Sequence, residues 1–159
     1  MRRVALVACV SMKRDTPAPA RDLYVSPWFK KARAIAETHD AWFILSAAHG
    51  VTHPDTTLAP YDTSLTTASA GYRRAWAARV NHELNAILRR GDHVTLLAGA
   101  RYRADLEQRL RRRGVRVTVP MRGLGIGQQL AFMTPPRALG GAQTAPRYTS
   151  TRDTKTGDA

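Results

Sequence analysis

Residues that could carry acid–base chemistry follow a short apolar run in the stretch FILSAAHG, residues 43–50. Ser46 and His49 lie at its end, next to a glycine. A histidine titrates near neutral pH, so His49 could act as a general base or donate a hydrogen bond to a leaving group. In the structural alternative, His49 only caps the turn by bonding to the backbone. We favour the functional interpretation, because the neighbouring serine and glycine are atypical of a strand that only fills a core.

Carboxylates that could assist such chemistry lie in the polar, proline-rich stretch HPDTTLAPYDTSL, residues 53–65. Asp55 or Asp62 could activate water or orient the histidine, and Tyr61 could stack on a base. The alternative is a surface loop that uses aspartate in its turns. We expect no metal site, because the histidines nearby lack a compact set of further ligands.

A second group of polar residues ends the first apolar run, in CVSMK at residues 9–13. Lys13 could bind an anion or, if desolvated, form a Schiff base as a nucleophile, and we favour anion binding. Cys9 is better explained as a small buried residue than as a nucleophile. Ser11 lies between them, where it could contact a substrate.

Arginines and glycines follow the other two apolar runs. Gly99 precedes Arg101 and Arg103, and Arg122 precedes GLGIGQQ at residues 123–129. Glycines let backbone N–H groups approach an anion, so this loop resembles a phosphate-binding turn. Glycines needed for a tight turn between strand and helix explain it equally well. The spacing matches neither the Walker A motif nor the dinucleotide fingerprint.

The elements that must position these residues follow from four apolar runs, at residues 3–9, 42–47, 93–99 and 115–120. Such runs, separated by helical patterns, predict parallel strands that are covered on both faces. We therefore predict an α/β fold, a three-layer sandwich with a central four-stranded, mainly parallel sheet and flanking helices. The carboxyl ends of parallel strands share one edge, where open α/β sheets bind ligands.

Helices are predicted between these strands from apolar periodicity, proline at a first turn and glycine after a last turn. The predicted ranges are 27–39 after the N-cap Ser26, 68–90 before Gly91, 102–113 before Gly114, and a short helix from about Gly125.

Composition predicts one folded domain over residues 1–133 and a flexible basic tail over 134–159. The net charge is +13 and the isoelectric point is near 11.2. A polyanionic partner that carries phosphate would explain this charge, as would an arginine-rich composition in general.

The N-terminus resembles a signal peptide, but its apolar stretch is short and leads into Lys13 and Arg14, so we predict a strand. No apolar run approaches the roughly 20 residues needed to cross a bilayer. The single cysteine excludes a disulfide within the chain. Together these features predict a cytoplasmic protein without membrane contact.

Several motifs taken together show a resemblance: VALVACVSMK, ARDLYVSPWFKKARAIAE, WFILSAAHG, PDTTLAPYD and MRGLGIGQQLAF. This set, within residues 3–133, resembles a short bacterial and phage family of unknown function to which the name YaaA-like is sometimes attached. That family looks distantly similar to the archaeosine synthase core and, through it, to the uracil-DNA glycosylase type of α/β sandwich.

The resemblance implies roles for particular residues. The archaeosine synthase pattern Cys-x3-Lys is matched by Cys9 and Lys13, and its later tyrosine and serine could correspond to Tyr24 and Ser26. In the archaeosine synthase pattern a proline precedes the cysteine, and this position is occupied by Ala8 here. The water-activating motif of uracil-DNA glycosylases is absent, so a loop aspartate would have to supply that carboxylate.

These observations predict an enzyme that acts on a nucleobase-bearing substrate, a nucleotide or nucleic acid, without a cofactor. The reaction would be cleavage or exchange at the N-glycosidic bond, or a base modification. One alternative is a nucleic-acid-binding protein without chemistry, and another is a small-molecule hydrolase or transferase of a biosynthetic pathway. The expected catalytic residues are Ser46, His49, Asp55 and Asp62, and the expected substrate-binding residues are Cys9, Ser11, Lys13, Tyr24, Ser26, Tyr61, Gly99, Arg101, Arg103, Arg122, Gly125 and Gln128.

Overall fold

The computed structural model describes residues 1–135, so all but the first two residues of the predicted basic tail lie outside the described part of the chain. Its centre is a five-stranded sheet with the order β4-β3-β1-β6-β7. The strands are β1 (Arg3–Ala8), β3 (Ala41–Ser46), β4 (Gly50–Thr52), β6 (His93–Leu97) and β7 (Arg116–Thr118). Neighbouring strands are parallel except for β3 and β4, which are antiparallel.

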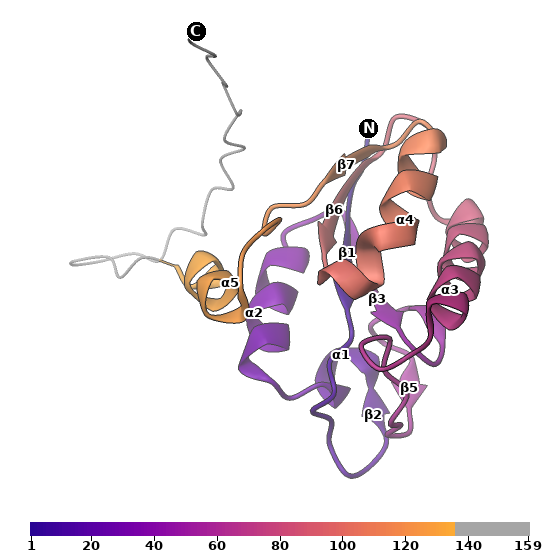
Figure 1. The fold of residues 1–159 in the computed structure, drawn as a ribbon. Helices are drawn as coiled ribbons and strands as arrows, with labels where there is room; N and C mark the ends of the chain where they lie inside the picture. Colours follow the sequence, from indigo (N-terminus) through magenta and orange to yellow (C-terminus); the bar gives the residue numbers. More distant parts are fainter. Residues whose placement is uncertain (136–159) are drawn as a thin grey trace, which may run out of the picture.

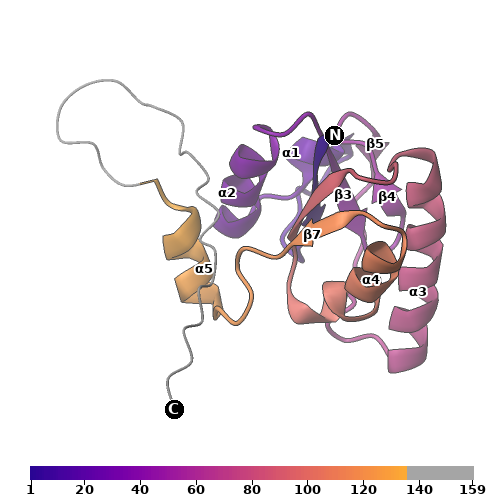
Figure 2. The ribbon, with the colours of Figure 1, turned by 90° about the horizontal axis from the view of Figure 1, so that it is seen from above.

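Helices cover both faces of this sheet (Figures 1 and 2). One face carries α2 (Pro27–Ala36) and α5 (Ile126–Met133), and the other carries α3 (Ala70–Glu83) and α4 (Ala100–Arg112). The predicted α/β sandwich is therefore confirmed. The sheet has one strand more than predicted, because β4 folds back on the outer side of β3.

Strand β1 forms the middle of the core. Its residues Val4 to Val7 are fully buried, as expected of a central strand that is covered on both faces. It pairs with β3 on one side and with β6 on the other. After β1, the chain first forms β3 and β4 on one side of it and later forms β6 and β7 on the other side. In open α/β sheets, such a reversal of strand order places a crevice at the carboxyl ends of the two strands, here β1 and β6.

Several helix boundaries are set by capping residues that can be recognised in the local sequence. Ser26 accepts a hydrogen bond from the backbone N–H of Phe29 (3.1 Å), and Pro27 occupies the first helical position, as predicted. Helix α3 is shorter than the predicted 68–90, since it ends at Glu83 and continues only as a 3-10 turn, η1 (Leu84–Ala86). Beyond it, the buried carboxylate of Asp92 accepts the N–H of Arg89 (2.9 Å) and turns the chain into β6.

A small second sheet lies beyond the carboxyl edge of the main one. It pairs β2 (Ala18–Pro19) with β5 (Thr57–Leu58), next to the single-turn helix α1 (Ala20–Leu23). In Figure 1 these elements lie at the lower end of the sheet, where β1 and β3 end. Within the described residues, no helix combines the length and apolarity needed to cross a membrane.

Candidate functional site

The end of β1 meets the end of β3 and the first turn of α4 at one cysteine. Cys9 is 5% exposed, and its sulfur accepts the backbone N–H of Ala47 at 3.3 Å. The same sulfur contacts the hydroxyl of Tyr102 at 3.3 Å. Tyr102 therefore joins α4 to the strand ends at the reversal of strand order.

A chain of hydrogen bonds between hydroxyl groups starts from the turn after β3. The backbone N–H of His49 donates to Ser46 Oγ (3.0 Å), and the Ser46 hydroxyl donates to Tyr61 Oη (2.7 Å). The hydroxyls of Tyr61 and Tyr24 are 2.6 Å apart. Because the serine already donates to Tyr61, the proton of Tyr61 is available for its contact with Tyr24. Three segments far apart in sequence are linked in this way.

Lys13 lies over the rings of this chain. Its Nζ is 4.3 Å from the ring centroid of Tyr61 and 5.6 Å from that of Tyr24, and it donates to the carbonyl oxygen of Val10 at 3.0 Å. Burial lowers the pKa of Lys13, and nearby Cys9 and Asp62 act in the opposite direction. A larger fraction of this amine is therefore neutral than in an ordinary lysine.

The rings of His49 and Tyr61 pack in a T-shaped arrangement. The ring centroids are 5.1 Å apart and the planes are perpendicular. The His49 side chain is exposed, and within residues 1–135 its ring nitrogens have no hydrogen-bond partner. The imidazole is therefore free to bond to a ligand.

The tyrosines of this region are neutral at physiological pH. Burial raises the pKa of Tyr24, of Tyr61 and of Tyr102 above the ordinary value for a phenol, and the nearby Cys9 adds to each shift. They can donate and accept hydrogen bonds, but they do not supply a phenolate. We call the whole set the tyrosine cluster; it consists of Cys9, Lys13, Tyr24, Ser46, His49, Tyr61, Asp62 and Tyr102.

One face of α3 holds the turn that carries Ser46 and His49. Four α3 side chains, spaced about one helical turn apart, bond to the backbone of this turn and of the adjoining β4. Donors are Trp76 to the Ser46 oxygen (2.9 Å), Tyr72 to the Ala47 oxygen (3.1 Å) and Arg79 to the His49 oxygen (2.9 Å), while Glu83 accepts from Val51 N–H (3.1 Å). The turn is thus fixed by a rigid helix, as a precise site requires.

The two candidate aspartates of the loop are separated. Asp62 lies close enough to Lys13 to influence its pKa. Asp55 instead forms an ion pair with Arg21 and lies beside His53, with 3.9 Å between carboxylate and ring nitrogen. This leaves Asp62 as the carboxylate of the tyrosine cluster.

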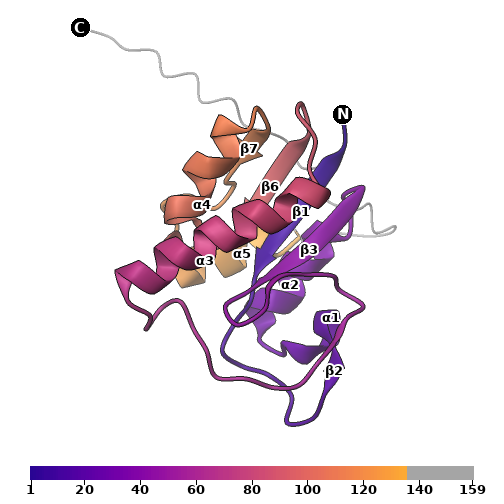
Figure 3. The same cartoon turned by 90° about the vertical axis from the view of Figure 1, so that its right-hand side faces the viewer.

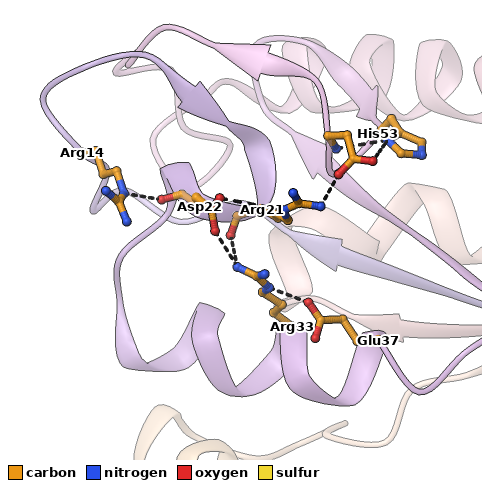
Figure 4. Close-up of polar contacts among 7 residues, drawn as sticks. Arg14, Arg21, Asp22, Arg33, Glu37 and His53 are labelled. Atoms are coloured by element: carbon orange, nitrogen blue, oxygen red, sulfur yellow. Dashed lines mark hydrogen bonds and ion pairs between the residues drawn. The ribbon is translucent and has the colours of Figure 1, made fainter.

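Figure 4 shows the network of which Arg21 and His53 are part. In it, Arg33 bridges Asp22 (2.9 Å) and Glu37 (2.6 Å), so that α1 is tied to α2. Arg14 donates to the carbonyl oxygen of Asp22 at 2.7 Å. These contacts fix the small sheet and α1 against the main domain.

Several other predicted residues form caps and ion pairs outside the tyrosine cluster. Ser26 caps α2, and Gly99 and Gly125 stand at the N-caps of α4 and α5. The side chain of Gln128 accepts the N–H of Gly125 at 3.0 Å, and Arg122 forms an ion pair with Glu107. The GLGIGQQ loop thus begins α5, as both explanations of its glycines require.

Of the remaining predicted residues, Ser11 is exposed and uses its carbonyl oxygen as an acceptor for Lys13 (3.4 Å). Arg103 is half-buried in the first turn of α4. Arg101, two residues before it, borders a cavity between α3 and α4.

Two aromatic residues of the site region were not predicted as such. Tyr102 and Trp76 are buried and pack edge to face, with ring centroids 5.6 Å apart. The spacing of Tyr102 to Leu106 and Leu110, one helical turn each, was the signal that could have placed Tyr102 on the buried face of its helix. Within residues 1–135, no group of three or more histidine, cysteine and carboxylate side chains could hold a metal ion.

Comparison with known proteins identifies a family but assigns no activity. The model of a family of unknown function, DUF6884, matches residues 4–135. No curated protein and no solved structure matches the chain.

Proposed function

The chain belongs to this family of unknown function, and we propose that it is an enzyme acting on a nucleobase-bearing substrate. The substrate class is a nucleotide or nucleic acid. The reaction is cleavage or exchange at the N-glycosidic bond, or a related base modification. The observation that carries the proposal is the half-buried amine of Lys13 above Tyr61, next to the unpartnered imidazole of His49 and near Asp62.

In the proposed reaction, His49 or Lys13 acts at the base and Asp62 acts at the sugar carbon of the N-glycosidic bond. When the bond between the sugar carbon and the base nitrogen breaks, its electron pair stays with the base. His49 or protonated Lys13 donates the proton that the departing base needs. The sugar carbon becomes positively charged, and the Asp62 carboxylate stabilises it. A water molecule then adds to that carbon and gives its proton to the Asp62 carboxylate.

The neutral hydroxyls have a positioning role in this scheme. Ser46 and Tyr24 bond to the hydroxyl of Tyr61 from two sides, so that its ring stays fixed below Lys13 and beside His49. A fixed aromatic face favours stacking of a flat base over less planar ligands.

The distant similarity to the archaeosine synthase core and to uracil-DNA glycosylases forms part of the proposal. It is supported by the proximity of Cys9, Lys13 and Tyr24, the residues that carry the resemblance. Lys13 and Tyr24 also pair through their backbones as an isolated antiparallel bridge. The net charge of +13 supports a partner that carries phosphate.

The experiment is a base-release assay. Purified full-length protein is incubated with nucleosides, nucleotides and short oligonucleotides, and free base is quantified by chromatography. Asp62→Asn is compared with the matched variant Asp55→Asn, which changes a carboxylate of the same loop outside the cluster. We expect Asp62→Asn and His49→Ala to lower turnover by about 10²- to 10⁴-fold, with substrate affinity retained. Asp55→Asn should keep full turnover.

Two results would contradict the proposal. Equal turnover in Asp62→Asn, His49→Ala and the unchanged protein would remove the tyrosine cluster from the chemistry. Release of no base from any substrate, together with binding of every polyanion that weakens as salt rises, would favour the non-enzymatic nucleic-acid-binding protein.

A further inference from the structure

Helices α3 and α4 begin side by side (Figures 1 and 3). A surface cavity lies between their first turns. Its volume is about 320 Å³. The charged residues that line it are Arg73 and Arg74 of α3 and Arg101 and Asp105 of α4, and the remaining lining residues are alanines. The short alanine side chains leave space between the first turns of the two helices.

In the part of the chain that the structure describes, two arginines of this cavity lack the carboxylate partner that several other helical arginines have. Elsewhere Arg33, Arg79 and Arg111 each form an ion pair with a carboxylate one helical turn away. Within residues 1–135, neither Arg74 nor Arg101 has an ion-pair or hydrogen-bond partner. Asp105 lines the same cavity, yet it pairs with none of the three arginines.

Three guanidinium groups against one carboxylate leave the cavity with a positive charge of about two, which attracts an anion. The planar guanidinium fork matches the oxygens of a phosphate group in pairs. Arg73 is already oriented, because it donates to the carbonyl oxygen of Ala68 at 2.6 Å. An inorganic or esterified phosphate is therefore the ligand class that fits these residues.

The cavity and the tyrosine cluster share one turn of α4. Arg101 lines the cavity, while the next residue, Tyr102, contacts Cys9 and packs its ring against Trp76 of α3. The two sites therefore adjoin each other at the first turn of α4. We propose that this cavity binds a phosphate group of the ligand whose base is held at the tyrosine cluster. The part played by the base rests on the proposed function, whereas phosphate binding does not.

The test is titration calorimetry of the full-length protein with sodium pyrophosphate at low ionic strength. The double variant Arg74→Gln/Arg101→Gln is compared with Arg89→Gln/Arg112→Gln, which removes the same charge. Arg89 and Arg112 are exposed, and within the described residues their side chains form no hydrogen bond or ion pair. We expect the cavity variant to lose about tenfold or more in affinity, since charge-assisted hydrogen bonds are removed. The control variant should change little.

Two further titrations identify the source of the phosphate. One uses a nucleoside 5′-monophosphate, and the other uses an oligothymidylate without terminal phosphates. A selective loss with the first ligand assigns the cavity to a terminal phosphate, and a selective loss with the second assigns it to the backbone of a nucleic acid. Equal losses in the cavity and control variants, or no loss in either, would overturn the proposal.

The outcome is separable from that of the base-release assay. If the cavity variant loses phosphate affinity and no substrate is turned over, the phosphate site stands and the enzymatic proposal fails. If the protein releases base from a nucleoside without phosphate, the cavity variant should retain that activity.

Discussion

Replacement of Gly50 by alanine tests how the turn between β3 and β4 is held. Gly50 has a φ of +71°, a left-handed backbone conformation that residues with a Cβ rarely adopt. A Cβ built at this position would lie 2.5 Å from Oε1 and 2.9 Å from Oε2 of Glu83. The Glu83 carboxylate would have to move, and its bond to the Val51 N–H (3.1 Å) would be lost.

The magnitude follows from these two effects. The left-handed conformation costs about 1–2 kcal/mol for a residue with a Cβ. Loss of a hydrogen bond to a charged group costs about 1.5–3 kcal/mol, and the lower end applies because the Glu83 side chain is 29% exposed. We therefore expect Gly50→Ala to lower the free energy of unfolding by about 3 kcal/mol. That corresponds to a fall in melting temperature of about 6–12 °C for a domain of this size.

Urea unfolding of two further variants separates the two effects. Gly91 has a φ of +90° with nothing within 4 Å of a built Cβ, so Gly91→Ala should show the conformational cost alone. In a Glu83→Ala background, Gly50→Ala should also cost only that amount, because the obstructing carboxylate is gone. The reasoning is refuted if Gly50→Ala costs no more than Gly91→Ala, or if its cost is the same in both backgrounds.

Tyr61→Phe should lower the free energy of unfolding by about 1–3 kcal/mol and by more than Tyr24→Phe, because it removes two hydrogen bonds between hydroxyl groups instead of one; chemical denaturation of both variants checks this order. Burial lowers the pKa of His39 and of His93 below 6.5, so the unfolded chain binds more protons than the folded protein just below that pH. Stability should therefore be fully present above pH 6.5 and fall as the pH drops through the lowered pKa values. Urea midpoints at pH 5.5 and 7.5 should differ less in His39→Gln/His93→Gln, and an equal difference would show that other groups cause it.

Strands β1, β3, β6 and β7 could be predicted because each lies in an apolar run, and only the first residues of β1 and β7 are exposed. Strand β4 could not, since it has only three residues and its pairing depends on the left-handed turn at Gly50. The true end of α3 was also missed, because the apolar positions Leu84 and Leu88 continue the helical period and are buried. The capture of the Arg89 N–H by Asp92 ends the helical path, and local periodicity does not reveal it.

The tyrosine cluster could be predicted in part. Parallel strands bring their carboxyl ends together, so the proximity of Cys9 to the end of β3 follows from the strand pattern. The choice between Asp55 and Asp62 could not be made, because it depends on where Arg21 of α1 lies. Tyr102 was overlooked as a site residue since it stands between two arginines, in a context typical of an exposed helix start.

The thiol of Cys9 can serve as a native probe of local opening at the junction of β1, α4 and the turn after β3. It is the single cysteine of the chain, and its sulfur is enclosed by groups that lie 38 and 93 residues further along the sequence. A thiol reagent can reach it only when the first strand separates from α4 or from the turn after β3. The rate of labelling under native conditions therefore measures how often this junction opens, without any engineered probe.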